Sequence, residues 1–102
     1  MGQPQGQRER ATGDGQRLDR WLWFTRLVKS RTSAAQLVAE GKVRVNRVRV
    51  LKPSHAIQPG DVLTFALRGH IRVVKVVECG HRRGPPLEAK MLYETLGSDP
   101  KP

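Results

Sequence analysis

The chain has 102 residues, with 19 Lys and Arg against 9 Asp and Glu, so its formal net charge is +10. Its apolar fraction of 37% allows one small core and leaves no room for a large enclosed active site. There is no apolar run long enough to span a bilayer and no apolar signal-peptide segment, so we expect a cytoplasmic protein without a membrane partner.

Composition divides the chain into a folded centre and two polar ends. Residues 1–16 are rich in Gly and Gln and almost devoid of apolar side chains, so they are expected to form a flexible arm. Residues 97–102 are expected to be a disordered tail. The prediction is one α+β domain over residues 17–96.

The first predicted element is a helix with an apolar stripe. Trp21 lies on that stripe and is expected in the core. Trp23 projects away from it and could pack on another element or stack on a base; packing is favoured because a small domain has a wide apolar face. The stripe consists of Leu18, Trp21, Leu22, Thr25 and Val28.

A second helix is predicted from Ser30, a good N-cap, to the helix-stopping Gly41. Its expected inward-facing residues are Ala34, Leu37 and Val38. Lys29 and Arg31 flank the cap, beside the unbonded N–H groups and the positive end of the helix dipole. This first turn is therefore a natural seat for a phosphate.

Residues 42–50 alternate strictly between basic and apolar side chains around Asn46, which predicts a β-hairpin. A two-residue turn at Asn46 and Arg47 places Arg44 directly opposite Arg49, with the valines on the other face. Like charges in this register cost roughly 0.2–1 kcal/mol. A phosphate bound between the two arginines would account for that cost.

The remainder is predicted to close a small sheet against the helices. Strands are expected at 55–57, 62–67 and 71–77, with turns at 59–61 and at Gly69. The pair Pro85 and Pro86 suits the start of a C-terminal helix. Its expected packing stripe is Leu87, Met91, Leu92 and Leu96.

The charge is concentrated in one part of the chain. Ten Lys and Arg fall between Arg17 and Lys52 with only Asp19 and Glu40 opposing them, a net +8 in 36 residues. Neutralising phosphates releases counterions, so this segment favours a nucleic acid partner over a merely solvated surface.

Metal binding and catalysis are not expected. The spacing of His55, His70, Cys79 and His81 matches no zinc motif, and the single cysteine cannot form an internal disulfide. Nor is there a paired set of acids, a nucleophile motif or a phosphate-cradling glycine loop. We therefore predict no enzyme activity, no cofactor and no small-molecule substrate.

Several motifs resemble the S4 RNA-binding domain. They are Arg17 to Trp23, Lys29-Ser30-Arg31, Gly41-Lys42-Val43, Val45-Asn46, Lys52-Pro53-Ser54 and Pro59-Gly60-Asp61. More narrowly, the Leu-Asp-Arg-Trp-Leu-Trp opening and the segment from Arg82 to Glu94 resemble the bacterial heat-shock protein 15 family. Many members carry Gly after the turn Asn, where this chain has Arg47.

The resemblance implies a small stand-alone protein that binds ribosomal RNA on the free large ribosomal subunit and helps rescue subunits carrying a nascent chain on tRNA. Alternatives are a general DNA- or RNA-binding protein, an RNA-targeting module of an enzyme, and a protein-only adaptor. A monomer is expected. The predicted RNA contacts are Arg17, Arg20, Lys29, Ser30, Arg31, Lys42, Arg44, Asn46, Arg47, Arg49 and Lys52, with Arg82 and Arg83 as a secondary patch.

Overall fold

The computed structural model describes residues 15–99, which form three helices and seven strands. The helices are α2 (Leu18–Phe24), α3 (Arg31–Ala39) and α4 (Pro86–Lys90). The strands are β1 (Gln16–Arg17), β2 (Val43–Val45), β3 (Val48–Val50), β4 (Ala56–Ile57), β5 (Val62–Leu67), β6 (His70–Val76) and β7 (Tyr93–Asp99).

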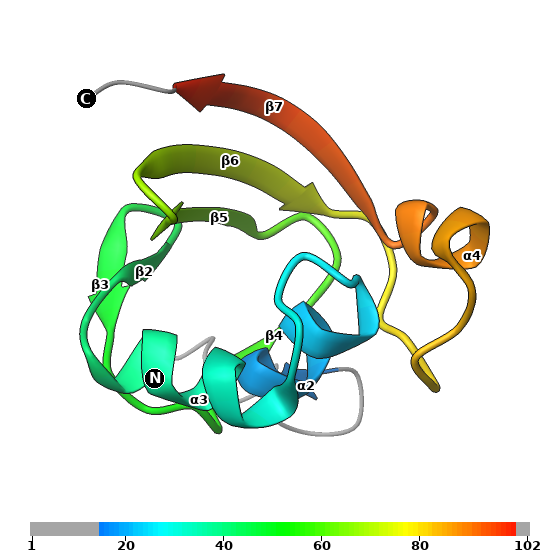
Figure 1. The fold of residues 1–102 in the computed structure, drawn as a ribbon, viewed down its shortest axis with the longest axis horizontal. Helices are drawn as coiled ribbons and strands as arrows, with labels where there is room; N and C mark the ends of the chain where they lie inside the picture. Colours follow the sequence, from blue (N-terminus) through cyan, green and yellow to red (C-terminus); the bar gives the residue numbers. More distant parts are fainter. Residues whose placement is uncertain (1–14, 100–102) are drawn as a thin grey trace, which may run out of the picture.

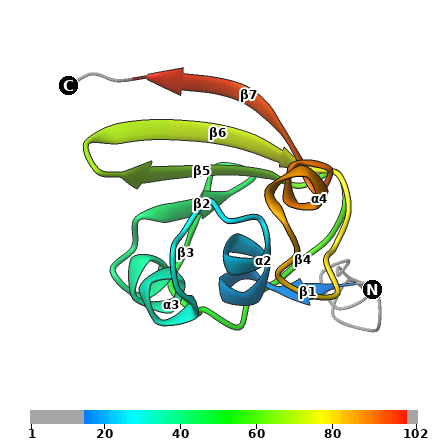
Figure 2. The same ribbon diagram turned by 45° about the vertical axis from the view of Figure 1, so that its right-hand side comes forward.

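Five strands form one antiparallel sheet in the order β3-β2-β5-β6-β7, and β1 pairs separately with β4. The sheet curves over α2 and α3, which lie on one of its faces, while α4 lies at one end beside the start of β7 (Figures 1 and 2). The predicted α+β class is confirmed. No helix within residues 15–99 is long and apolar enough to cross a membrane.

The core lies between the two helices and the sheet. Trp21 is fully buried there, as predicted, and its indole N–H donates to the Glu78 carbonyl at 2.9 Å. Ala34, Leu37 and Val38 of α3 are also buried, which confirms the predicted inward face. Because both helices contribute to one core, the loops at their ends are held in defined positions.

Helix α2 is shorter than its apolar stripe. It ends at Phe24, and Arg26 adopts a left-handed conformation with φ 65°. Val28 nevertheless fills the core from the connecting loop and is only 3% exposed. At the other end, the N–H groups of Leu18 and Asp19 donate to carbonyls of the 53–55 loop.

The hairpin register is confirmed. Val43 pairs with Val50, Arg44 with Arg49 and Val45 with Val48. Both turn residues have positive φ, 51° at Asn46 and 76° at Arg47, so Arg47 occupies the position that glycine favours in a tight hairpin turn. One valine departs from the expected buried face, since Val48 beside the turn is 65% exposed.

The C-terminal segment corrects the prediction of one long amphipathic helix. Helix α4 ends at Lys90, and β7 then pairs with β6 through a bulge at Val73 and Val74. Of the expected stripe only Leu92 is buried, and Leu96 lies in the strand. The physical reason is that β6 would otherwise have an unpaired edge, whose N–H and C=O groups β7 satisfies.

The described strands also include residues outside the predicted limits of 17–96. Strand β7 continues to Asp99, and the Gln16 side chain forms two hydrogen bonds with the Gly80 backbone. Of the predicted arm and tail, residues 1–14 and 100–102 lie outside the described residues.

Candidate nucleic-acid interface

The basic residues near α2 and α3 gather around one buried carboxylate. Asp19 is only 3% exposed, and the Arg17 guanidinium donates to both of its carboxylate oxygens at 3.0 Å. The backbone N–H of Arg20 also donates to this carboxylate at 2.8 Å. Arg17 is therefore held in place by Asp19, with its side chain still half-exposed.

The ion pair shifts the pKa of both Asp19 and Arg17. Burial alone would raise the pKa of Asp19, but the hydrogen bond and charge of Arg17, the Arg20 N–H and the charge of Arg31 together lower it below the ordinary value. The pKa of Arg17 is raised, chiefly by its hydrogen bond to Asp19. Helices α2 and α3 also pack against each other.

Ser30 caps α3 as predicted. Its hydroxyl oxygen accepts a hydrogen bond from the Ser33 N–H at 3.0 Å. Arg31 and the preceding Lys29 are both exposed. The exposed start of this nine-residue helix thus combines two cationic side chains with the positive end of the helix dipole.

A second basic group lies around Gly41, at the end of α3. Gly41 has φ +77°, and a Cβ added there would lie 3.3 Å from Cδ of Arg49, so the Arg49 side chain passes directly over this glycine. Lys42 and Arg44 line a shallow hollow of about 310 Å³ beside it, with Thr64 among the other lining residues. Lys42 also pairs with Glu40 at 3.3 Å on the surface.

The segment after β3 connects the two basic groups. A Cβ added at Gly41 would lie 3.3 Å from Cδ2 of Leu51, and the Pro53 carbonyl accepts the N–H of Asp19 at the start of α2. Lys52 lies between them and is exposed. The hairpin and the helix pair therefore have a fixed relation, and Figure 1 shows this loop passing from β3 beneath α3 to β4.

Seven predicted contact residues are exposed and form no side-chain hydrogen bond or ion pair with any other residue of 15–99, so their charges remain available to a partner. They are Arg20, Lys29, Arg31, Arg44, Arg47, Arg49 and Lys52.

The Asn46 side chain forms hydrogen bonds that stabilise the fold. Its side-chain amide donates to Asp61 at 3.1 Å, and its side-chain oxygen accepts the Val62 N–H at 2.9 Å. This pairing joins the hairpin turn to the start of β5. The RNA contact expected of Asn46 from the sequence stays a prediction.

Arg82 and Arg83, the predicted secondary patch, both form contacts within the chain. Arg82 pairs with Glu88 at 2.7 Å. Arg83 donates to the Trp23 carbonyl at 3.1 Å, and its guanidinium lies 5.4 Å from the centre of the Trp23 ring. Trp23 is partly buried and packs against the core, which is the alternative favoured from the sequence, and Arg83 covers its ring. RNA contact by Arg82 and Arg83 stays a prediction.

One basic group beyond the hairpin was not among the residues predicted from the sequence. Arg68, His70 and Arg72 line a common hollow at the far end of β5 and β6. The available signal was the alternation of His70 and Arg72 on the β6 face that also carries Val74 and Val76. No group of three or more His, Cys, Asp or Glu within residues 15–99 could hold a metal ion.

Comparison with known proteins identifies the family. Residues 16–63 match the S4 domain, and small ribosomal subunit protein uS4 from Azoarcus sp. (strain BH72) is 39% identical over 72 residues, covering 69% of this chain and 34% of that protein. Heat shock protein 15 from Escherichia coli (strain K12) is 38% identical over 78 residues, 76% of this chain.

The curated heat shock protein 15 relatives are longer than the matched region, since the chain spans 58% of the Escherichia coli protein and 64% of the homologue from Haemophilus influenzae. A solved structure of trimeric heat shock protein 15 from Vibrio cholerae superposes with a TM-score of 0.75 and 32% identity over 79% of this chain and 81% of that chain. The chain therefore belongs to the heat shock protein 15 family and carries that family's S4 domain.

Proposed function

We propose that the chain is an RNA-binding protein rather than an enzyme, and that it recognises structured ribosomal RNA through its S4 domain. The observation that carries this proposal is the set of exposed basic side chains on α2, α3 and the β2–β3 hairpin, which have no acidic partner within residues 15–99. Unneutralised charge at that density favours a polyanionic ligand.

The start of α3 is the proposed seat for one RNA phosphate. The Ser30 hydroxyl accepts the Ser33 N–H and so caps the helix, while the N–H groups of Arg31 and Thr32 in the same first turn have no intrahelical partner. Arg31 and Lys29 add charge at the same place, and a guanidinium can bind two phosphate oxygens at once. A phosphate bound here would gain from the helix dipole as well as from both side chains.

The hairpin is the second proposed contact. Arg44 and Arg49 lie directly opposite each other, with no acidic side chain paired to either among the described residues. A phosphate between them would replace mutual repulsion with two attractive contacts. Arg47 at the turn extends the same basic surface to the tip of the hairpin.

Recognition of this kind depends on RNA shape. The deep major groove of A-form RNA is not readily read, so phosphates presented at fixed spacing must carry much of the specificity. The fixed relation between α3 and the hairpin provides such a spacing. With about five phosphates contacted, log affinity is expected to fall with log salt at a slope of roughly −4.

The proposed partner is the free large ribosomal subunit, and the proposed role is rescue of subunits that carry a nascent chain on tRNA. Family membership and the similarity to a small ribosomal subunit protein support a ribosomal partner, which would place the protein in the cytoplasm. We propose a monomer; the relative from Vibrio cholerae is described as a trimer, so sedimentation velocity of this chain tests the assignment.

Sedimentation with separated small subunits, large subunits and assembled ribosomes tests the function. The double variant Arg31→Glu with Arg44→Glu is compared with Lys75→Glu with Lys90→Glu, which changes charge equally at exposed positions outside the interface. The proposal is supported if the unchanged protein and the lysine variant are retained on large subunits and the arginine variant is not. Equal, salt-labile retention on all particles and on duplex DNA would instead indicate a general nucleic-acid-binding protein.

A further inference from the structure

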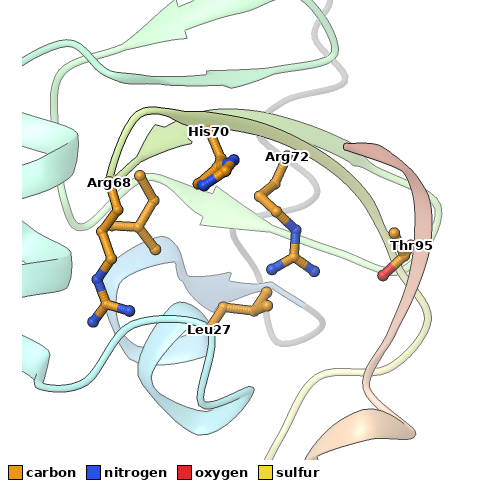
Figure 3. A pocket seen from close by; sticks show the side chains of 6 residues that line it. Leu27, Arg68, His70, Arg72 and Thr95 are labelled. Carbon is orange, nitrogen blue, oxygen red and sulfur yellow. The ribbon is translucent and has the colours of Figure 1, made fainter. Parts of the chain in front are cut away.

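A hollow of about 400 Å³ lies at the far end of the sheet, on the face that α2 and α3 cover elsewhere. It is lined by the β5–β6 turn, by β6, by β7 and by the loop after α2 (Figure 3). Except for Leu27, its lining residues follow the segment that matches the S4 domain, residues 16–63. The lining residues are Leu27, Leu67, Arg68, His70, Arg72 and Thr95.

On this face, the side chains of β6 change from apolar to basic along the strand. Val74 and Val76 of β6 are fully buried against the helices, but the next two residues on the same face are Arg72 and His70. Neither Arg68 nor Arg72 forms an ion pair or side-chain hydrogen bond with another residue of 15–99. Figure 3 shows Arg72 extending from β6 toward Leu27, with Arg68 on one side and Thr95 on the other.

The β5–β6 turn, which carries Arg68, has a left-handed backbone conformation. Arg68 has φ 55° and Gly69 has φ 81°, the same pair of left-handed residues that Asn46 and Arg47 adopt in the first hairpin. A long cationic side chain is unfavourable in this backbone conformation, where Asn or Gly is preferred. Both hairpin turns thus place an arginine beside a basic surface at a conformational cost.

The lining fits a nucleotide. Two guanidinium groups can bind a phosphate, the Thr95 hydroxyl can donate to a sugar or base, and Leu27 with Leu67 offers an apolar wall for a base. The volume falls within the usual range for small-ligand sites, about 300–1,000 Å³. Leu27 also precedes Lys29 by two residues, so a short stretch of one loop connects the hollow to the proposed phosphate seat at α3.

We propose that this hollow binds one nucleotide of a single-stranded RNA segment that continues from the RNA held on α3. Arg68 and Arg72 bind its phosphate, and the base lies against Leu27. This inference rests on the proposed function, since it assumes that RNA already occupies the S4 surface. It adds a site for an unpaired strand beside a site for structured RNA.

The test uses a fluorescent RNA stem–loop with or without a short oligouridine tail. The variant Arg68→Asn with Arg72→Gln removes both charges, and Asn tolerates the positive φ; Lys75→Gln with Lys90→Gln is the charge-matched control. We expect the tail to strengthen binding to the unchanged protein and the control. The hollow variant should bind the tailed RNA about tenfold or more weakly, with a salt slope shallower by about 0.7 for the one phosphate lost.

Amide NMR spectra then locate the contact and distinguish its source. Oligouridine should shift the resonances of Leu27, Gly69 and Arg72, whereas uridine monophosphate and inorganic phosphate at equal concentration should shift them far less. Equal shifts with the free mononucleotide, equal losses in both variants, or no effect of the tail would overturn the inference. Binding of the tail-less stem–loop, weakened by Arg31→Glu with Arg44→Glu, reports separately on the proposed function.

Discussion

Replacing Arg47 with glycine should separate stability from RNA binding. Arg47 has φ 76° and an exposed side chain without a partner within residues 15–99. Left-handed backbone costs a non-glycine residue roughly 1–2 kcal/mol. Glycine adds about 0.4–1 kcal/mol of chain entropy to the unfolded state. The difference predicts that Arg47→Gly stabilises the free protein by about 0.5–1 kcal/mol.

For a domain of this size that gain corresponds to a rise in melting temperature of about 2–8 °C. The same substitution removes one proposed phosphate contact, so RNA binding should weaken and its salt slope should become shallower by about 0.9. Calorimetry measures the first effect, and RNA titration at several salt concentrations measures the second.

Two matched variants separate charge from backbone strain at this position. Arg47→Lys keeps both the charge and the strain, so its melting temperature and salt slope should stay near those of the unchanged protein. Arg47→Asn removes the charge and relieves much of the strain. A lower melting temperature for Arg47→Gly would refute the strain argument, and an unchanged salt slope would remove Arg47 from the interface.

Three further predictions follow from contacts elsewhere in the domain. Arg49→Glu replaces a cross-strand repulsion with Arg44 by an attraction, so chemical denaturation should show a gain of about 0.2–1 kcal/mol while RNA binding is lost; a loss of stability would contradict the register. Gly80→Ala puts a Cβ 2.8 Å from the Phe24 ring, which should cost about 1–3 kcal/mol in the same assay; an unchanged midpoint would show that the site can relax. The pKa of Asp19 is lowered in the folded protein, so as pH falls this carboxylate is protonated in the unfolded chain before it is protonated in the folded one. The stability that ionised Asp19 contributes above about pH 4 is therefore lost as pH falls through the folded-state pKa. Asp19→Asn should therefore flatten the acid limb of stability against pH, and an equally steep limb would assign it to other groups.

Local chemistry was enough to predict the helix pair and the hairpin. A cap at Ser30 and a stop at Gly41 define α3 because both signals act within one turn of the helix ends. The alternation from residue 42 to 50 sets the hairpin register because neighbouring side chains on a strand point to opposite faces. These are short-range effects, and the basic surface followed from them without knowledge of the rest of the fold.

Long-range pairing decided what the sequence left open. Residues 93–99 became a strand because β6 offered an unpaired edge, although an apolar helical stripe was also present. The Asn46 side chain bonds to Asp61 and to the Val62 N–H, fifteen and sixteen residues later, and this pairing depends on how β5 lies beside the hairpin.

Composition and local spacing therefore determined that this chain has a basic surface formed by the start of α3 and the β2–β3 hairpin. Only the tertiary structure brought Leu27 opposite Arg68 and Arg72 to form the second basic hollow. The physical reason is that contacts between residues more than forty positions apart depend on how the sheet folds over the helices, and no local periodicity encodes that arrangement.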